Sequence, residues 1–459
     1  MLNDATIGEL KASLRGELIQ RADPQYEEAC KLYNAMIDKR PLLIARCVDV
    51  ADVISAVQFA RKHELLTAIR GGGHNGPGLG SCNDGLVIDL GLMNGVRVDP
   101  ANRAVRVEGG STQGGMEHAT HAFGLAVPAG IVSTTGVGGL TLGGGHGYLS
   151  RKYGLTIDNL LEADVVLADG TLVTASASQH NDLFWALRGG GGNFGVVTSF
   201  LFRAHPVGTV FGGPIFWELK DAPKVMKWYR QFLTQSPVDL SPFLHLGTVP
   251  AAEPFPKEIR GKKNCALIMC YTGPLEKGPE AVRPIREELP PPILDWMGPM
   301  PFPVLQSLFD PLLPKGLQWY WKGDFVRELS DQAIDVHVQH TLQSPSPLSI
   351  THLYPIDGAA HKVGPSETAW NCRDARWSMV IAGIDPDPAK AEALKTWARG
   401  YWEAVHPFNL GGAYVNFMME EGEDRIRATY GGNYDRLAGI KKKYDPMNFF
   451  RVNQNIKPV

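Results

Sequence analysis

The segment at positions 70–76 has the residue types of a phosphate-binding loop with a reactive side chain inside it. It reads RGGGHNG and directly follows a strand predicted over 65–70. Because glycine has no side chain, successive backbone N–H groups there can converge on an anionic phosphate. We therefore predict that the segment binds a pyrophosphate. Glycines alone would fit a surface turn equally well, and the embedded His74 and Asn75 favour the binding site.

A second glycine cluster lies at positions 134–147, which read TTGVGGLTLGGGHG. Each glycine costs about 1 kcal/mol in a helix interior, so this many glycines need a reason. Close contact between the backbone and a flat or phosphorylated ligand is such a reason. The alternative is a flexible linker. The flanking segments 127–133 and 148–155 are apolar and expected to be strand-like, which disfavours the linker.

A third cluster at positions 190–195 matches the G-x-G-x-x-G spacing of Rossmann folds, so a nicotinamide enzyme has to be considered. The context disfavours it. The residues that follow, VVTSFLFRAHP, predict a strand where a Rossmann fold needs a helix, and the next 20 or so residues lack the acidic residue expected to bind the ribose.

The sequence shows little sign of other catalytic or metal-binding motifs. The sequence has no G-x-S-x-G, no H-E-x-x-H and no lysine of the P-loop type. Two histidine pairs, His118 with His121 and His337 with His340, are spaced for one helical face, but no third metal ligand accompanies them. We interpret them as surface or core histidines. The six scattered cysteines predict reduced, mostly buried thiols.

The elements that must position these loops follow from periodicity. A helix is predicted over 49–64, capped by Asp49 or Asp52, and the strand over 65–70 then enters the first glycine loop. Segments 85–90 and 96–100 look like a pair of short strands, and 163–176 looks like a hairpin that turns at Asp169 and Gly170. The order predicts a mixed α+β domain and not a regular βαβ winding.

From about position 206 the composition and the pattern of predicted elements change. Prolines become more frequent. Predicted helices at 222–233 and 387–405 alternate with strand-like segments at 265–271, 348–354 and 377–383. We expect a second domain here that covers a substrate.

The overall composition bounds the class of protein. The chain has 459 residues, with 45 basic and 48 acidic side chains and a net charge of -3, which disfavours a nucleic-acid or membrane-surface role. The run Lys441 to Lys443 is expected on a solvated helix face. No stretch approaches the ~18 apolar residues of a membrane span, and the first 20 residues lack a secretory core. A cytoplasmic location is the default expectation.

Four segments together resemble the berberine bridge enzyme-like branch of the FAD-linked oxidases, within the vanillyl-alcohol oxidase superfamily, and especially its bacterial 6-hydroxynicotine oxidase-like members. They are RGGGHN and the segments at 130–155, 184–198 and 433–456. The resemblance implies a PCMH-type FAD-binding domain of two subdomains and a substrate domain with an antiparallel sheet covered by helices. It places the FAD-binding domain at 1–206, the substrate domain at 207–424 and a tail at 425–459 that returns to the FAD domain.

The resemblance also implies the cofactor, one FAD bonded through its 8α-methyl group to His74. Many members add a second bond through a cysteine at the position of Val132, so a single bond is expected here. Thr135 falls where the family places a residue that governs oxygen access, and its small side chain resembles the oxidase pattern. The residues expected to bind the cofactor are Arg70, Gly71, Gly72, Gly73, His74, Asn75, Gly80, Ser81, Val132, Thr134, Thr135, Gly138, Gly139, Gly145, Gly147, Val197 and Asn453.

Two catalytic candidates come from the same resemblance. Tyr414 and Asn416 match a Tyr-x-Asn that lines the family's active site, although a strand tyrosine packed in a core would look the same. The chain departs from the family pattern at two places, so the substrate and the base of a family member cannot be assigned to it. Positions 370–373 read WNCR where members often have Phe-x-His-Arg, and the glutamate that serves some plant members as a base falls near Ile381.

The expected reaction is hydride transfer from a CH-OH or CH-NH group of a small organic substrate to the flavin, and then to oxygen with release of hydrogen peroxide. An alcohol needs a base, for which Tyr414 is the candidate, whereas a neutral amine does not. Two alternatives stay open: a dehydrogenase with another acceptor, and a flavin-binding protein without turnover. The expected second domain has six tryptophans, which could bind an aromatic or sugar-like ligand or could equally pack in a core. They are Trp217, Trp296, Trp319, Trp321, Trp370 and Trp377. Oligomeric state is not predicted.

Overall fold

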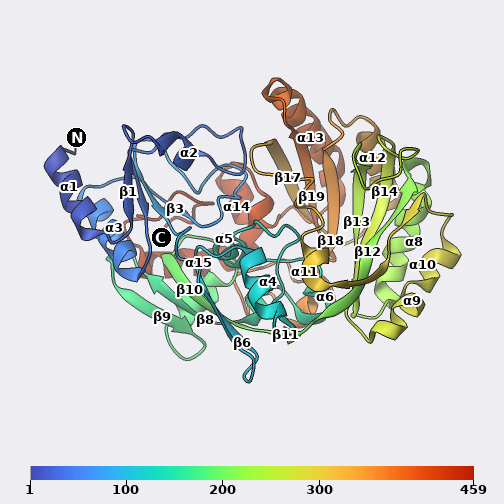
Figure 1. Ribbon diagram of the computed structural model, residues 1–459, viewed down its shortest axis with the longest axis horizontal. Helices are drawn as coiled ribbons and strands as arrows, with labels where there is room; N and C mark the ends of the chain where they lie inside the picture. Colours follow the sequence, from blue (N-terminus) through green and yellow to red (C-terminus); the bar gives the residue numbers. More distant parts are fainter. Residues whose placement is uncertain (1) are drawn as a thin grey trace.

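The computed structural model describes residues 2–459, and its two halves lie side by side (Figure 1). The N-terminal half carries a four-stranded, a five-stranded and a two-stranded sheet, and the other half is built on one large sheet. The overall α+β class agrees with the sequence-based expectation. No helix within residues 2–459 is both long and apolar enough to cross a membrane.

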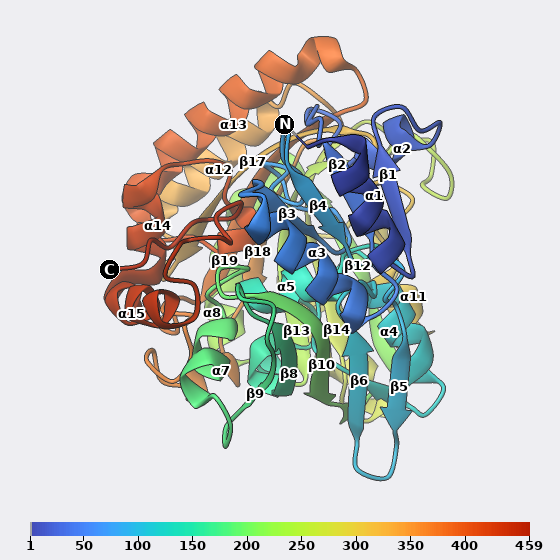
Figure 2. The same cartoon turned by 90° about the vertical axis from the view of Figure 1, so that its left-hand side faces the viewer.

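The first sheet has the strand order β1-β2-β4-β3 and positions the first glycine loop. Its strands are β1 (Glu17–Gln20), β2 (Leu43–Arg46), β3 (Thr67–Arg70) and β4 (Leu86–Asp89), and the helices beside them are α1 (Asp4–Ser13), α2 (Tyr26–Cys30) and α3 (Val50–Lys62). As predicted, α3 begins where the Asp49 carboxylate accepts the Asp52 N–H at 3.1 Å. Figure 2 shows α3 packed in front of this sheet. Strand β3 then ends at Arg70, so the glycine loop starts at the sheet's edge.

The second sheet is antiparallel, with the order β5-β6-β10-β8-β9. Its strands are β5 (Val96–Asp99), β6 (Ala104–Glu108), β8 (Leu160–Val166), β9 (Leu172–Ser176) and β10 (Val196–Arg203). The predicted hairpin is confirmed, because β8 and β9 pair through a turn in which Gly170 has φ +85°. Strand β10 follows the third glycine cluster, where a Rossmann fold would have placed a helix.

One expected pairing is wrong. Strands β4 and β5 do not pair with each other but belong to different sheets. Strand β4 is already bonded on both edges, to β2 and to β3 in parallel register. The chain therefore leaves the first sheet after Asp89, and β5 pairs with β6 instead.

The large sheet has the order β15-β12-β14-β13-β18-β19-β17, with β16 also paired to β12. Its strands are β12 (Thr209–Glu218), β13 (Leu240–Thr248), β14 (Lys263–Tyr271), β15 (Leu294–Asp295), β16 (Gly298–Pro301), β17 (Gln318–Val326), β18 (Ile350–Pro355) and β19 (Trp377–Asp385). All neighbouring strands within this sheet are antiparallel to each other. Helices α8 (Ala222–Gln235), α12 (Asp331–Leu342) and α13 (Ala391–Val405) cover one face (Figure 1).

The remaining elements are short. They are α4 (Gln113–His121), β7 (Leu125–Ala126), α5 (Val137–Gly143), α6 (Ser150–Tyr153), α7 (Asn181–Leu187), β11 (His205–Pro206), α9 (Gly278–Ala281), α10 (Arg283–Glu288), α11 (Phe302–Gln306), α14 (Glu423–Tyr430) and α15 (Tyr434–Tyr444). The flanks of the second glycine cluster are not strands as expected. Segment 127–133 is irregular and 148–155 contains α6, whereas the cluster itself forms α5.

The C-terminal residues pack against the N-terminal half. The Lys441 ammonium donates to the carbonyls of Asn193 and Phe450, at 2.7 and 2.8 Å, and to the Asp445 carboxylate at 2.6 Å. The expectation of a solvated face for this lysine run is therefore wrong at its first position, since Lys441 is fully buried while Lys442 and Lys443 are exposed. Burial lowers the pKa of Lys441, and Asp445 opposes that shift.

Candidate active site

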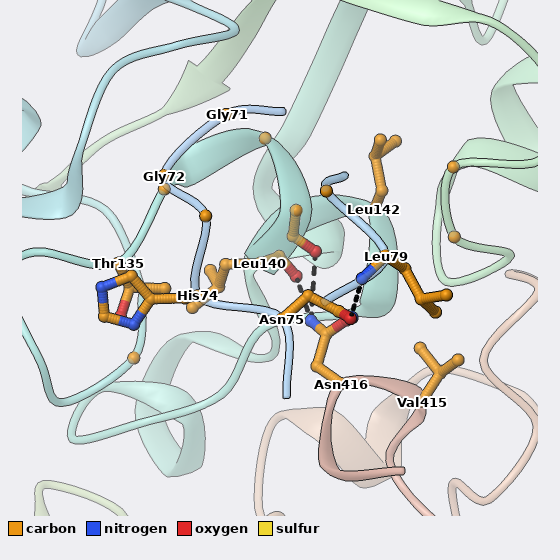
Figure 3. Close-up of a pocket in the computed structure, with 18 of the residues that line it drawn as sticks. Gly71, Gly72, His74, Asn75, Leu79, Thr135, Leu140, Leu142, Val415 and Asn416 are labelled. Atoms are coloured by element: carbon orange, nitrogen blue, oxygen red, sulfur yellow. Dashed lines mark hydrogen bonds between the residues drawn. The ribbon is translucent and has the colours of Figure 1, made fainter. Parts of the chain in front are cut away.

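A cavity of about 330 Å³ lies between the glycine loops and the face of the large sheet that α8, α12 and α13 do not cover, and Figure 3 shows the part of its wall around His74, Asn75 and Asn416. The N-terminal half supplies residues from all three glycine clusters and from the strands beneath them. The large sheet supplies alternate residues of β17, β18 and β19, because successive side chains of a strand point to opposite faces. The sheet residues in the wall are Trp319, Trp321, Ile350, His352, Tyr354, Val380 and Ala382.

Two of the glycine loops cross in backbone contact. A Cβ atom at Gly72 would lie 2.4 Å from the Gly136 nitrogen, and one at Gly136 would lie 2.3 Å from the Gly72 nitrogen. No side chain fits at either position, so glycine is required for the two loops to form one wall. This contact explains part of the glycine richness that the sequence shows at both loops.

The first loop also has unused hydrogen-bond donors. Within residues 2–459, the backbone N–H groups of Gly72, Gly73, His74 and Asn75 donate to no protein acceptor. The Asn75 side chain closes the following turn by accepting the Leu79 N–H at 2.8 Å (Figure 3). Consecutive unpaired N–H groups in a loop that lines a cavity suit an anionic group such as a pyrophosphate.

His74 is held in the cavity wall by two contacts. Its Nε2 atom lies 3.0 Å from the Thr134 hydroxyl oxygen, and its ring stacks on Tyr33 with centroids 3.9 Å apart. Burial lowers the pKa of His74 to about 4, and the contact with Thr134 opposes that shift. The imidazole is therefore neutral at pH 7, which is the form that can act as a nucleophile.

Most of the other predicted cofactor residues line the same cavity. They are Arg70, Gly71, Gly80, Val132, Thr135, Gly138, Gly139, Val197 and Asn453. The Arg70 guanidinium, however, already pairs with Asp89 at 2.8 Å and with the Ala29 carbonyl at 2.7 Å. Its charge is therefore neutralised within the fold.

Four predicted residues do not line the cavity, and one of them, Thr134, contacts its wall through His74. Gly145 donates its N–H to the Tyr414 hydroxyl, at 3.2 Å, and Gly147 approaches the Ala129 carbonyl so closely that a Cβ would lie 2.2 Å from its oxygen. Ser81 lines a neighbouring pocket beside Leu79 and Asn453. These residues shape the backbone around the cavity.

The two catalytic candidates, Tyr414 and Asn416, lie in direct contact in the cavity wall. The Asn416 amide donates to the Tyr414 hydroxyl at 2.7 Å, and it also donates to the Gly139 carbonyl at 3.1 Å. The Tyr414 hydroxyl donates weakly to the Leu140 carbonyl at 3.4 Å. Burial raises the pKa of Tyr414, while the N–H donors of Asn416 and Gly145 oppose the shift.

Sequence reasoning missed several wall residues. Tyr33 lies far from every glycine motif, and His146 stands inside a motif that drew attention only for its glycines. The inward residues of β17, β18 and β19 alternate along their strands, so period-two spacing could have indicated them. Of the six tryptophans, Trp319 and Trp321 line the cavity, whereas Trp217 and Trp377 are buried in the core under the helices.

The two departures from the family pattern have structural counterparts. Trp370 lies beside Tyr414, with ring centroids 5.2 Å apart, and Arg373 pairs with Asp158 at 2.7 Å. Ile381 points into the helix-covered core, while its neighbours Val380 and Ala382 face the cavity. No carboxylate therefore stands at the place where some plant members carry a base.

The residues present fit FAD. Close-packed glycines with unpaired N–H groups suit the pyrophosphate, and the apolar wall formed by Leu90, Val197 and Phe200 suits a flat ring. Within residues 2–459, no group of three or more His, Cys, Asp or Glu residues could hold a metal ion. The fold and the cavity define a flavin-binding oxidoreductase of the PCMH type.

Comparison with known proteins gives the family. A model for an FAD binding domain matches residues 41–176, and a model described as "Berberine and berberine like" matches residues 413–457. The chain is 31% identical to an FAD-linked oxidoreductase of Dictyostelium discoideum, over 99% of this chain and 97% of that protein. It is 28% identical to (R)-6-hydroxynicotine oxidase of Paenarthrobacter nicotinovorans, over 97% of each chain.

A solved structure agrees over almost the full length. The crystal structure of 6-hydroxy-D-nicotine oxidase from Arthrobacter nicotinovorans superposes with a TM-score of 0.87 and 26% identity, covering 97% of this chain and 99% of that one. The chain belongs to the berberine bridge enzyme-like family of FAD-linked oxidoreductases. It is an enzyme whose cofactor is FAD.

Proposed function

We propose that this enzyme is an oxidase that carries FAD on a single covalent bond to His74 and oxidises a small organic substrate at a CH-OH or CH-NH group. When bound, FAD supplies the two-electron acceptor, and oxygen would take the electrons onward with release of hydrogen peroxide. The domain division at 206 and 424, with a tail that returns to the FAD domain, is part of the same proposal. The contacts of Lys441 with the N-terminal half support it.

The observation that carries the proposal is the state of His74. A neutral imidazole, stacked on Tyr33 and oriented by Thr134, stands in the wall of a cavity that suits FAD. The bond would replace one hydrogen of the 8α-methyl group, and the two electrons released would pass to oxygen. Val132 lines the cavity with an apolar side chain and has no thiol for a second bond.

The cavity wall supports a small substrate with aromatic or other apolar surface. Trp319, Trp321 and Phe417 line it, and so does Thr135, a small residue that would leave room for oxygen. (R)-6-hydroxynicotine oxidase, which is similar over nearly the whole chain, is named for an aromatic heterocyclic substrate. Tyr414 and Asn416 would orient the reacting group through hydrogen bonds, and their mutual contact fixes both side chains.

The first experiment is an absorbance spectrum of the purified protein before and after acid precipitation. We expect flavin colour in the pellet for the wild type, and in the supernatant for His74→Ala. His118→Ala is the matched control, because His118 is exposed on α4, and it should keep its flavin in the pellet. A wild-type protein that binds no FAD at all would overturn the assignment, and colour released into the supernatant would remove only the covalent bond.

The electron acceptor is tested separately. The enzyme is reduced with dithionite without oxygen, and air is then admitted while peroxide is measured. We expect rapid reoxidation with one peroxide per flavin. Flavin that stays reduced in air would favour the alternative, a dehydrogenase with another acceptor. A protein whose flavin is reduced by no alcohol or amine would favour the second alternative, a flavin-binding protein without turnover.

A further inference from the structure

His146 is a buried histidine with two unused ring nitrogens. It is 4% exposed, and neither Nδ1 nor Nε2 has a hydrogen-bond partner within residues 2–459. The side chain nevertheless lines the cavity. Buried polar groups in folded proteins nearly always have a partner, and leaving one unpaired costs about 1–3 kcal/mol. Neither nitrogen is open to the cavity as the ring stands, so a ligand in the cavity reaches one of them by a turn of the ring about its side-chain bonds.

The surroundings of His146 are aromatic and uncharged. Its ring centroid lies 4.7 Å from that of Tyr414, 5.1 Å from Tyr354 and 5.4 Å from Phe417. Burial lowers the pKa of His146 to about 3, so the ring is neutral at pH 7. A neutral imidazole has one nitrogen that accepts a proton and one that donates.

The other candidate bases of the cavity are already engaged. The Tyr414 oxygen accepts hydrogen bonds from Gly145 and Asn416, which fill the lone pairs it would need as a base. His352 bonds through one nitrogen to His245 at 2.8 Å and through the other to Tyr354 at 2.5 Å. His74 uses its Nε2 on Thr134 and is the proposed flavin ligand. Among the cavity histidines, His146 alone has both nitrogens free within the described chain.

The charge of the wall favours an uncharged substrate. Within residues 2–459, no Asp or Glu lines the cavity, and its one permanently charged residue, Arg70, is paired with Asp89. A protonated amine would therefore lose its hydration without gaining a counter-charge, which is costly in a buried site. An alcohol enters such a cavity without that cost, but its oxidation requires a base for the hydroxyl proton.

We propose that His146 is a catalytic residue that binds the hydroxyl group of an alcohol substrate and accepts its proton. This inference rests on the proposed oxidase function and narrows the substrate to the alcohol class. In the step, the C–H and O–H bonds of the carbinol break and a C=O double bond forms. The hydride, with both electrons, passes to oxidised flavin, and the proton passes to a ring nitrogen of His146. Tyr414 and Asn416 then act as orienting groups.

The test uses the FAD-loaded enzyme and two substitutions, His146→Gln and His146→Phe. Without oxygen, benzyl alcohol and related aromatic alcohols are mixed rapidly with each protein, and flavin reduction is followed by absorbance. Removal of a general base lowers rates by about 10²–10⁴-fold, so we expect a loss of at least about 100-fold in both variants, with unchanged FAD content. His337→Gln is the matched control, because His337 is equally buried but lies under the helices, bonded to Tyr401. It should stay within about threefold of the wild type.

A second measurement does not depend on turnover. Phenol has a hydroxyl group on a carbon without hydrogen, so it can bind but cannot give up a hydride. In protein labelled with ¹⁵N-histidine, phenol should shift the ring-nitrogen signals that disappear in His146→Gln, and it should bind at least about tenfold more weakly to His146→Phe.

Two results would overturn the proposal: flavin reduction that stays within about threefold in both variants, or His146 signals that do not respond to saturating phenol. An enzyme whose flavin is reduced by no alcohol and no amine, but whose His146 signals respond to phenol, would contradict the oxidase function and retain the hydroxyl site. The two failures are thereby distinguished.

Discussion

The rings of Tyr33 and His74 lie face to face, with centroids 3.9 Å apart and planes 19° apart. Tyr33 belongs to an irregular segment near the N-terminus. Its hydroxyl donates to the carbonyl of Leu313, which lies 280 residues later in the chain, at 2.6 Å. The tyrosine thus joins the histidine loop to the half that carries the large sheet. It fixes the plane of the imidazole that is proposed to bond the flavin.

This stack makes a prediction about flavin attachment. Tyr33→Ala should leave the His74 ring free to rotate and should lower the fraction of covalently bound FAD at least about fivefold, as measured by acid precipitation. Tyr33→Phe keeps the stack and loses only the bond to Leu313, so it should retain most of the attachment. Equal attachment in both variants would show that the stack does not orient the histidine.

The crossing of the two glycine loops makes a prediction about stability. Gly72→Ala and Gly136→Ala each force a methyl group into backbone atoms, so each should lower the free energy of unfolding by about 1–3 kcal/mol and weaken FAD retention. Gly8→Ala is the control, because its methyl group meets nothing within 4 Å and stands in helix α1, where alanine is favoured by up to about 1 kcal/mol. Chemical denaturation and flavin absorbance measure both effects, and an unchanged Gly72→Ala protein would contradict the close approach.

The buried pair of Lys441 and Asp445 makes a prediction about the C-terminal residues. Lys441→Met leaves the Asp445 carboxylate buried without its partner, which should cost about 3–5 kcal/mol in the free energy of unfolding. Lys442→Met changes the next residue of the same helix, which is exposed, and should shift stability by less than about 0.5 kcal/mol. A thermal scan of both variants distinguishes the buried from the solvated position, and two equal midpoints would refute the assigned role.

Buried histidines make the fold sensitive to acid. Burial lowers the pKa of His337 to about 3, below its ordinary value of 6.5, so the unfolded chain binds a proton there before the folded protein does. Stability is therefore lost as the pH falls below about 6.5, by about 2 kcal/mol for this one group between pH 7 and pH 5. Urea unfolding at both pH values should show that much less pH dependence in His337→Gln than in the wild type. If the two proteins show the same pH dependence, His337 does not stay neutral in the folded state.

The local features of the site could be predicted from the sequence, and the long-range ones could not. The order of helix, strand and glycine loop around His74 depends on neighbours within about 30 residues, and the structure has it as expected. The pairing of β4 and β5 was mispredicted because the sequence cannot show that both edges of β4 are taken by β2 and β3. Lys441 was mispredicted because a run of charges hides which of its members turns inward.

His146 shows the same limit for the site. Its motif is visible in the sequence, but its function depends on Tyr354 and Phe417, which are more than 200 residues away in the chain. Only the folded sheet brings those rings against it. Composition and spacing show which residues lie near a loop in the sequence. Whether a histidine has hydrogen-bond partners depends on the tertiary structure.

The Lys441 contacts have a consequence for the retention of the cofactor. The ammonium holds Asn193, in the third glycine loop, to Phe450, and Asn453 and Gln454 then form part of the cavity wall. The wall is therefore incomplete until residues 441–454 have packed against the third glycine loop. Tight retention of FAD is accordingly coupled to the docking of this segment, so that a chain whose segment is undocked lacks part of the cavity wall.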